Sequence, residues 1–317
     1  MLEEVAKIIR GLSVDAIEKA NSGHPGLPLG CAEIGTVLFS EVLKHDPEKP
    51  DWLDRDRFVL SAGHGSMLLY ALLHLSGYDI TIKDIMNFRQ IGSKTPGHPE
   101  YRHTPGVEVT TGPLGQGFAN GVGMALAERI LAEKFNEEEF DIINHYTYVL
   151  ASDGCMMEGI TSEAASLAGH WGLEKLIVIY DKNQISLAGR TDLTFSESVA
   201  ERYRSYNWQV IDNVNGHDLD EIKSALMKAR EKNGKPVLIL AHTHIGYGAP
   251  TKQDSHIAHG APLGHEEVIG LKKNLGLPVD KTFYISNEVR EFFEKRKSEL
   301  RQSRKQWDDK FISWSEK

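Results

Sequence analysis

Short apolar runs and longer segments with helical spacing alternate along this chain. The apolar runs have the length of buried strands and occupy residues 57–60, 146–151, 176–180, 208–211 and 237–242. Apolar positions at helical spacing predict helices over residues 3–20, 31–43, 119–132, 158–171 and 218–232, and another that ends at Leu75. Strands that alternate with helices in this way predict an α/β fold, a mostly parallel, doubly wound sheet with helices on both faces.

Two further segments depart from this alternation. Residues 88–113 are rich in Gly, Pro and His with little periodicity, and they are interpreted as a long functional loop. Residues 1–265 are assigned to one domain and 266–317 to a C-terminal helical extension that packs at a subunit interface. The extension carries one apolar stripe, formed by Val289, Phe293, Leu300, Trp307, Phe311 and Trp314. Its basic residues are interleaved with acidic ones, which favours a solvated helix face over an anionic partner.

Composition narrows the class of protein. The 317 residues are 40% apolar and 26% charged, and the net charge of -9 gives no reason to expect nucleic-acid binding. No apolar segment is long enough to cross a membrane. Residues 1–8 predict an amphipathic helix and not a signal peptide. Cys31 and Cys155 lie far apart, which favours a reducing compartment over a disulfide framework. A cytoplasmic location is therefore expected.

An acidic residue and an amide follow two neighbouring predicted strands. Asp153 and Gly154 come directly after one strand, and Asn183 follows the next strand thirty residues later. Both would lie at the carboxyl edge of the sheet, where open α/β sheets bind ligands. Carboxylate and amide oxygens suit Mg²⁺ or Ca²⁺, with diphosphate oxygens completing the coordination. An Asp-Gly pair alone also occurs as an ordinary turn, but Asn183 at this distance favours the metal site.

Four histidines lie in Gly-rich loops: His24, His64, His98 and His259. Imidazoles donate to phosphates and move protons near neutral pH, and flanking glycines allow close approach to a ligand. A single loop histidine is more often a plain surface residue, but four in the same local setting favour a common site. Zinc is a competing ligand, although no histidine–cysteine spacing resembles a zinc site.

Several motifs, in this order, resemble transketolase. They are Asn21-Ser-Gly-His-Pro-Gly26, Arg55-Asp-Arg-Phe-Val-Leu-Ser-Ala-Gly-His64, Gly97-His-Pro-Glu100, Gly112-Pro-Leu-Gly-Gln-Gly117, the Asp153 motif with Asn183, Ile245-Gly-Tyr-Gly248 and His259-Gly-Ala-Pro-Leu263. The resemblance extends to about residue 315. In that family the corresponding region is the diphosphate-binding domain for thiamine diphosphate.

The resemblance implies a role for each matching residue. Asp153, the Asn183 side chain and the Ile185 carbonyl would bind the metal, Mg²⁺ or Ca²⁺. The residues expected to bind the cofactor are His64, Gly112, Pro113, Leu114, Asp153, Gly154, Asn183 and His259. The residues expected to be catalytic are His24, His64, His98 and His259. Of these, His24 and His98 would contact hydroxyl groups of the substrate. Glu158 would join a carboxylate network at a subunit interface, or would only favour the start of a helix. Ser152 departs from the usual glycine, and we expect it to be tolerated.

The chain is about half as long as a full transketolase. In the family, a separate pyrimidine-binding domain supplies the glutamate that activates the cofactor, and no segment after residue 265 is long enough to form it. The resemblance therefore implies the N-terminal subunit of a split enzyme, in an α₂β₂ assembly with a C-terminal subunit, acting on sugar phosphates. The alternatives are another ketol-transferring enzyme, such as a deoxyxylulose-phosphate synthase, and a non-catalytic cofactor-binding relative.

Overall fold

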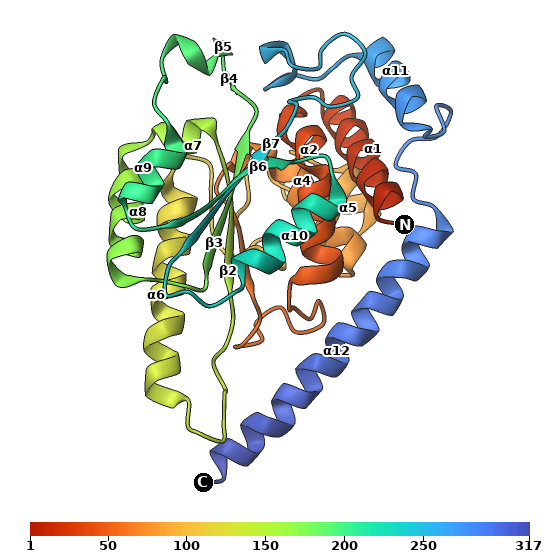
Figure 1. Cartoon of the computed structure of the whole chain (residues 1–317). Coiled ribbons are helices and arrows are strands. Elements are labelled where there is room, and N and C mark those ends of the chain that lie inside the picture. The colour runs from red at the N-terminus through yellow and green to blue at the C-terminus, as the bar shows by residue number, and fades with distance from the viewer.

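A five-stranded sheet forms the centre of the computed structural model, which describes residues 1–317 (Figure 1). The strand order is β1-β2-β3-β7-β6, and every neighbouring pair is parallel. The strands are β1 (Arg57–Leu60), β2 (Thr147–Ser152), β3 (Leu176–Lys182), β6 (Gln209–Asn215) and β7 (Val237–His242). All five correspond to the apolar runs of the sequence, and the predicted fold class is confirmed.

Helices cover both faces of the sheet. One face carries α6 (Gln116–Phe135), α8 (Gly159–Trp171) and α9 (Val199–Ser205). The other carries α1 (Leu2–Ala20), α3 (Ala32–Val37), which continues as a wider π turn (Leu38–Val42), α4 (Ser66–Ser76) and α10 (Leu219–Ala229). All six residues of β2 are buried, as are the first five of β7. Burial on both faces explains why these strands are continuous apolar runs.

The strand order opens a crevice at the carboxyl edge of the sheet. After β3 the chain passes to α9 on one face, whereas after β7 it passes to α11 (His265–Leu275), which packs against α1 on the other. The connections that follow β3 and β7 therefore run to opposite faces of the sheet. Neither connection covers the space at the ends of these two strands. Such points are where open α/β sheets bind ligands.

Some short elements were not expected from the sequence. Residues Gly26–Gly30 form the helix α2 and not a loop, and all five are buried. The segment before the long loop contains α5 (Ile82–Met86), which begins at a reciprocal cap between Thr81 and Asp84. After β2 comes the short helix α7 (Asp153–Met157), and after β3 a small hairpin of β4 (Ile185–Ser186) and β5 (Gly189–Arg190). These elements are too short for periodicity to reveal.

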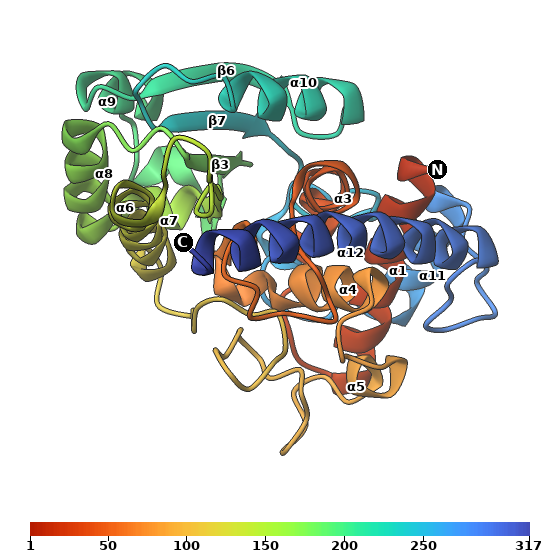
Figure 2. The same cartoon turned by 90° about the horizontal axis from the view of Figure 1, so that it is seen from below.

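The last helix, α12 (Asn287–Ser315), lies across α4 and reaches the end of α6 (Figure 2). Val289 and Phe293 belong to the main apolar core. Further along, the Trp307 indole N–H donates to the Ile142 carbonyl at 2.8 Å, and Trp314 packs edge-on against Phe135. The predicted stripe therefore contacts this same chain, while its place at a subunit interface stays a prediction. None of the helices combines the length and apolar character that crossing a bilayer requires.

Acid is expected to destabilise the fold through His45, which is only 3% exposed. Its Nδ1 lies 3.1 Å from the Tyr78 hydroxyl, and the two rings stack. Burial lowers the pKa of His45 from 6.5 to about 4. Between these values the unfolded chain binds a proton that the folded chain does not. The free energy of unfolding should therefore fall as pH drops through this window, by up to about 3 kcal/mol from this residue.

Urea unfolding at a series of pH values tests this expectation. In His45→Gln the decrease in unfolding free energy between pH 6.5 and 4 should be smaller than in wild type, because the glutamine does not titrate. The comparison uses the slope of the unfolding free energy against pH. A loss of stability that is the same at every pH therefore does not affect it. Equal slopes in both proteins would contradict a buried, neutral His45.

Candidate active site

A cavity of about 430 Å³ lies at the carboxyl edge of the sheet. Its walls come from the segments that follow β1, β2, β3 and β7, and from α2. The predicted residues that line it are His24, His64, Gly112, Leu114, Ser152, Gly154, Glu158, Asn183, Ile185 and His259. Residues distant in sequence are thus brought to one place by the parallel topology.

The four loop histidines form one cluster. The His24 ring centre lies 5.3 Å from that of His64, 5.8 Å from His259 and 6.1 Å from His98. The rings of His64 and His259 stack at 4.9 Å. The structure therefore joins loops that are more than 230 residues apart in sequence, and it makes the interpretation as four unrelated surface residues untenable.

The imidazoles are uncharged at neutral pH. Burial, together with the charge of Arg89, lowers the pKa of His24 to about 4. Burial and the neighbouring imidazoles lower the pKa of His64 to about 3, and burial also lowers the pKa values of His98 and His259. The Arg89 guanidinium lies 3.2 Å from His24 Nδ1. Because a guanidinium can only donate, Nδ1 accepts, and the ring proton of neutral His24 is on Nε2.

Asp153 lies beneath the cavity wall and is 3% exposed. Its Oδ1 accepts a hydrogen bond of 2.5 Å from the Tyr180 hydroxyl. Its Oδ2 accepts from the backbone N–H groups of Asn183 and Gln184 at 3.2 and 2.9 Å. The turn after β3 thus closes on the carboxylate that follows β2. Burial raises the pKa of Asp153 despite these bonds.

A second buried carboxylate, Asp181, lies at the end of β3. It accepts hydrogen bonds from Asn183 Nδ2 at 3.0 Å and from the Thr243 hydroxyl. Burial raises the pKa of Asp181 to about 6, and the charge of Asp153 contributes. Neither carboxylate forms an ion pair with a Lys or Arg side chain. Two uncompensated buried acids beside an amide oxygen form an oxygen-rich environment that fits a divalent cation such as Mg²⁺.

A side chain at position 154 would crowd the cavity where the backbone of α7 faces it. A Cβ on Gly154 would lie 2.7 Å from the Leu114 side chain, which lines the opposite wall. Two positions earlier, Ser152 has an extended backbone that any residue can adopt, and its hydroxyl donates to Cys155 Sγ at 3.6 Å. The serine is therefore accommodated by a partner inside the fold.

The comparison with known proteins decides the family. The whole chain, residues 1–317, matches the family model described as "Transketolase, thiamine diphosphate binding domain". The transketolase of Treponema pallidum (strain Nichols) is 53% identical over 314 residues, which are 99% of this chain and 47% of that protein. The chain belongs to the transketolase family.

Solved transketolase structures share the fold. The enzyme from Leishmania mexicana superposes with a TM-score of 0.97 at 47% identity, over 99% of this chain and 47% of that one. A transketolase structure from Pichia stipitis gives the same TM-score at 43% identity, over 99% and 46% of the two chains. This chain thus spans about half the length of the transketolases it matches.

Some predicted transketolase residues lie outside the cavity lining. Asp153 is covered, as described above, and Pro113 is exposed beside the lining residue Gly112. The ring of His98 packs next to Gly112, where a Cβ would lie 3.7 Å from it. Glu158 is exposed at the cavity margin. Arg89, Tyr180 and Asp181 were given no role from the sequence. Their neighbours His24, Asp153 and Asn183 were the only signal that pointed to them.

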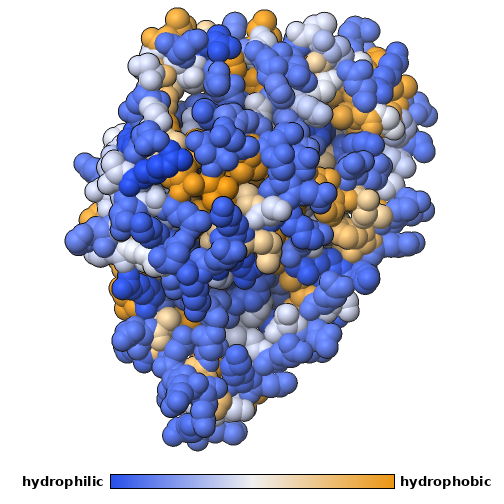
Figure 3. Space-filling model, in the orientation of Figure 1, coloured by the Kyte–Doolittle hydropathy of each residue, from blue (hydrophilic) through white to orange (hydrophobic).

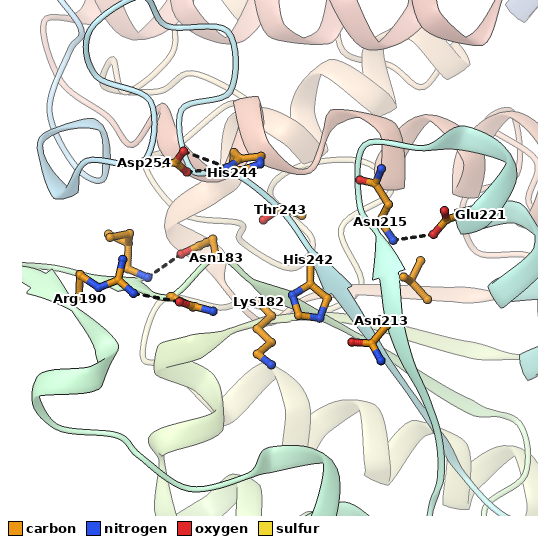
Figure 4. A pocket seen from close by; sticks show the side chains of 13 residues that line it. Lys182, Asn183, Arg190, Asn213, Asn215, Glu221, His242, Thr243, His244 and Asp254 are labelled. Atoms are coloured by element: carbon orange, nitrogen blue, oxygen red, sulfur yellow. Dashed lines mark hydrogen bonds and ion pairs between the residues drawn. The ribbon is translucent and has the colours of Figure 1, made fainter.

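A second, open pocket of about 640 Å³ adjoins the transketolase cavity (Figure 4). Asn183 and Ile185 line both spaces. Asn183 Oδ1 accepts a hydrogen bond from the Ile185 backbone N–H at 3.0 Å. The side chains of Lys182 and His242 project into the second pocket, away from Asn183. The turn after β3 therefore lies between the two spaces and contributes to the lining of both.

Proposed function

We propose that this chain is the cofactor-binding half of a transketolase. Together with a second half that carries a pyrimidine-binding domain, it would transfer a two-carbon ketol unit from a ketose phosphate to an aldose phosphate. The observation that carries the proposal is the cluster of four neutral imidazoles, three of which line one cavity together with Asn183. The backbone of the same turn holds the Asp153 carboxylate beneath the cavity wall. A Pichia stipitis transketolase with a TM-score of 0.97 was solved in complex with sedoheptulose-7-phosphate, which supports sugar phosphates as the substrate class.

The proposed cofactor set is thiamine diphosphate with Mg²⁺. When bound, thiamine diphosphate supplies the carbon nucleophile that carries the two-carbon unit. Asp153, the Asn183 amide oxygen and the Ile185 carbonyl would hold the metal, and Gly154 would let the backbone approach the diphosphate. Hard oxygen ligands and two uncompensated acids support Mg²⁺, and Ca²⁺ would be the substitute with the same ligand preference.

The histidines are proposed to bind the substrate and move protons. His24 would donate from Nε2 to a substrate hydroxyl, since its Nδ1 is engaged by Arg89. His98 is proposed for a neighbouring hydroxyl. The stacked pair of His64 and His259 would lie near the diphosphate and the reacting carbons. Neutral rings suit these tasks, because each ring has one nitrogen that donates and one that accepts.

A partner is proposed to complete the site. Large apolar side chains are exposed on α6 and α8, the two helices that begin near the cavity. They are Ile160 at the start of α8, and Leu167, Trp171, Ile130 and Leu131 further along the two helices. The face seen in Figure 3 is mostly hydrophilic, with separate apolar patches. We propose that a C-terminal transketolase subunit covers the apolar residues of α6 and α8, with Glu158 at the contact, in an α₂β₂ assembly. The free thiols of Cys31 and Cys155 support the proposed cytoplasmic location.

Reconstitution tests the proposal. The purified chain is expected to have no ketol-transfer activity, because the group that activates the cofactor would belong to the other half. Mixing it with a separately produced pyrimidine-binding half, thiamine diphosphate and Mg²⁺ should produce activity, measured as aldose phosphate released from a ketose phosphate. The second half alone is the control. Full activity of the chain by itself would refute the split site, and an inactive but assembled mixture would refute the transketolase function.

A further inference from the structure

We infer that Tyr180 and Asp181 are positioning residues for the two side chains proposed to bind the metal. The inference rests on the proposed function and deepens it. Tyr180 and Asp181 are consecutive residues at the end of β3, and both are 1% exposed. Successive strand residues point to opposite faces of a sheet. One strand end therefore reaches Asp153 with one side chain and Asn183 with the next.

Tyr180 fixes the orientation of the Asp153 carboxylate. Its hydroxyl donates to Oδ1 at 2.5 Å, while two backbone N–H groups of the following turn hold Oδ2. A carboxylate offers about four acceptor positions, and three are occupied by these donors. About one position is left for a cation, so Asp153 would bind the metal through a single bond in a fixed direction.

Asp181 fixes the orientation of the Asn183 amide. Asp181 Oδ2 can only accept, so the group it contacts at 3.0 Å is the amide nitrogen of Asn183. The amide oxygen is thereby directed to the other side, where the Ile185 N–H also reaches it. Without Asp181, the two ends of this amide could exchange places and present a nitrogen to the cation. Thr243 holds Asp181 in turn through its hydroxyl.

A fixed, singly bonded carboxylate favours Mg²⁺ over Ca²⁺. Mg²⁺ requires a near-ideal octahedron of six ligands, whereas Ca²⁺ accepts six to eight ligands and often a bidentate carboxylate. Removal of the Tyr180 hydroxyl frees an acceptor position and lets Asp153 rotate. Mg²⁺ binding should then weaken by about 10- to 100-fold, the usual cost of losing such a partner. Ca²⁺ binding should weaken less, because the freed position can contact the larger ion.

The experiment compares Tyr180→Phe with Tyr148→Phe in the reconstituted enzyme saturated with thiamine diphosphate. Tyr148 is a matched control, because it is fully buried on the adjacent strand and its hydroxyl has no hydrogen-bond partner. Isothermal titration calorimetry with MgCl₂ and with CaCl₂ gives the two affinities. Circular dichroism of each metal-free variant shows whether the fold is retained.

The expected result is a Mg²⁺ affinity that falls more than the Ca²⁺ affinity in Tyr180→Phe, with both unchanged in Tyr148→Phe. Unchanged affinities in Tyr180→Phe would overturn the inference. Equal losses for both ions would also overturn it, since a general structural defect does not discriminate between them. If wild type binds neither ion, the proposed function fails and not merely the role of Tyr180.

Discussion

Asp153→Asn is expected to lower ketol transfer by the reconstituted enzyme by more than about 100-fold, because loss of even an outer partner of a metal site costs up to that factor. Asparagine keeps the shape of the side chain, and its amide oxygen can still accept hydrogen bonds from the backbone N–H groups of Asn183 and Gln184. It removes one of the two buried negative charges that would attract the metal. The rate is measured with saturating thiamine diphosphate over a range of Mg²⁺ concentrations.

The stability of the Asp153 variant separates binding from folding. Burial raises the pKa of Asp153, which means that the folded protein disfavours its charged form. The metal-free asparagine variant should therefore unfold at the same temperature as wild type or higher. Asp280→Asn, at an exposed position, is the control and should leave both the rate and the stability unchanged. Near wild-type activity in Asp153→Asn would exclude this carboxylate as a metal ligand.

His24→Ala is expected to lower kcat by about 10²- to 10⁴-fold, the range for removing a group that transfers protons in catalysis. His24 lies at the centre of the cluster, with the other three rings around it. Its Nε2–H is the donor that the contact with Arg89 leaves available. Affinity for Mg²⁺ and thiamine diphosphate should change little, because His24 is not among the proposed metal ligands.

A conservative variant shows what His24 contributes. The side-chain amide of His24→Gln can donate a hydrogen bond but cannot accept and release a proton near neutral pH, so it should recover substrate affinity more than kcat. His265→Ala, at the exposed start of α11, is the control for loss of a histidine and should behave as wild type. If His24→Ala keeps the wild-type kcat, the cluster has no proton-transfer role through this ring.

Strands were more predictable than short helices, for a physical reason. β1 and β7 match the expected residues because burial on both faces requires an unbroken apolar run. β3 extends further than its apolar run, into Asp181 and Lys182, because backbone pairing with β7 does not depend on side-chain polarity. Residues 26–30 contain Pro28 and two glycines, which predict a loop. They form α2 because surrounding elements bury all of them.

The candidate site was partly visible in the sequence. Asp153 and Asn183 directly follow strands, and the four histidines stand beside glycines in connecting segments. Polar side chains at such positions have few structural tasks, so their chemistry was recognisable. Tyr180 belongs to an apolar strand and is indistinguishable there from a core residue. Its hydroxyl acquires a role only because strand pairing sets Ala151 opposite Tyr180 and so brings Asp153 within reach. Arg89 likewise could not be distinguished by sequence pattern, because it lies in a long loop without periodicity.

The contact between Trp307 and Ile142 has a consequence for the order of assembly during synthesis. It joins positions 165 residues apart. At ribosomal rates of about 5–20 residues per second, roughly 8–33 s pass between synthesis of the two residues. The segment before β2 therefore gains this contact only after the strands of the sheet are available to pair. We expect α12 to pack after the rest of the domain has emerged, and only then to fix the position of the segment that leads into β2.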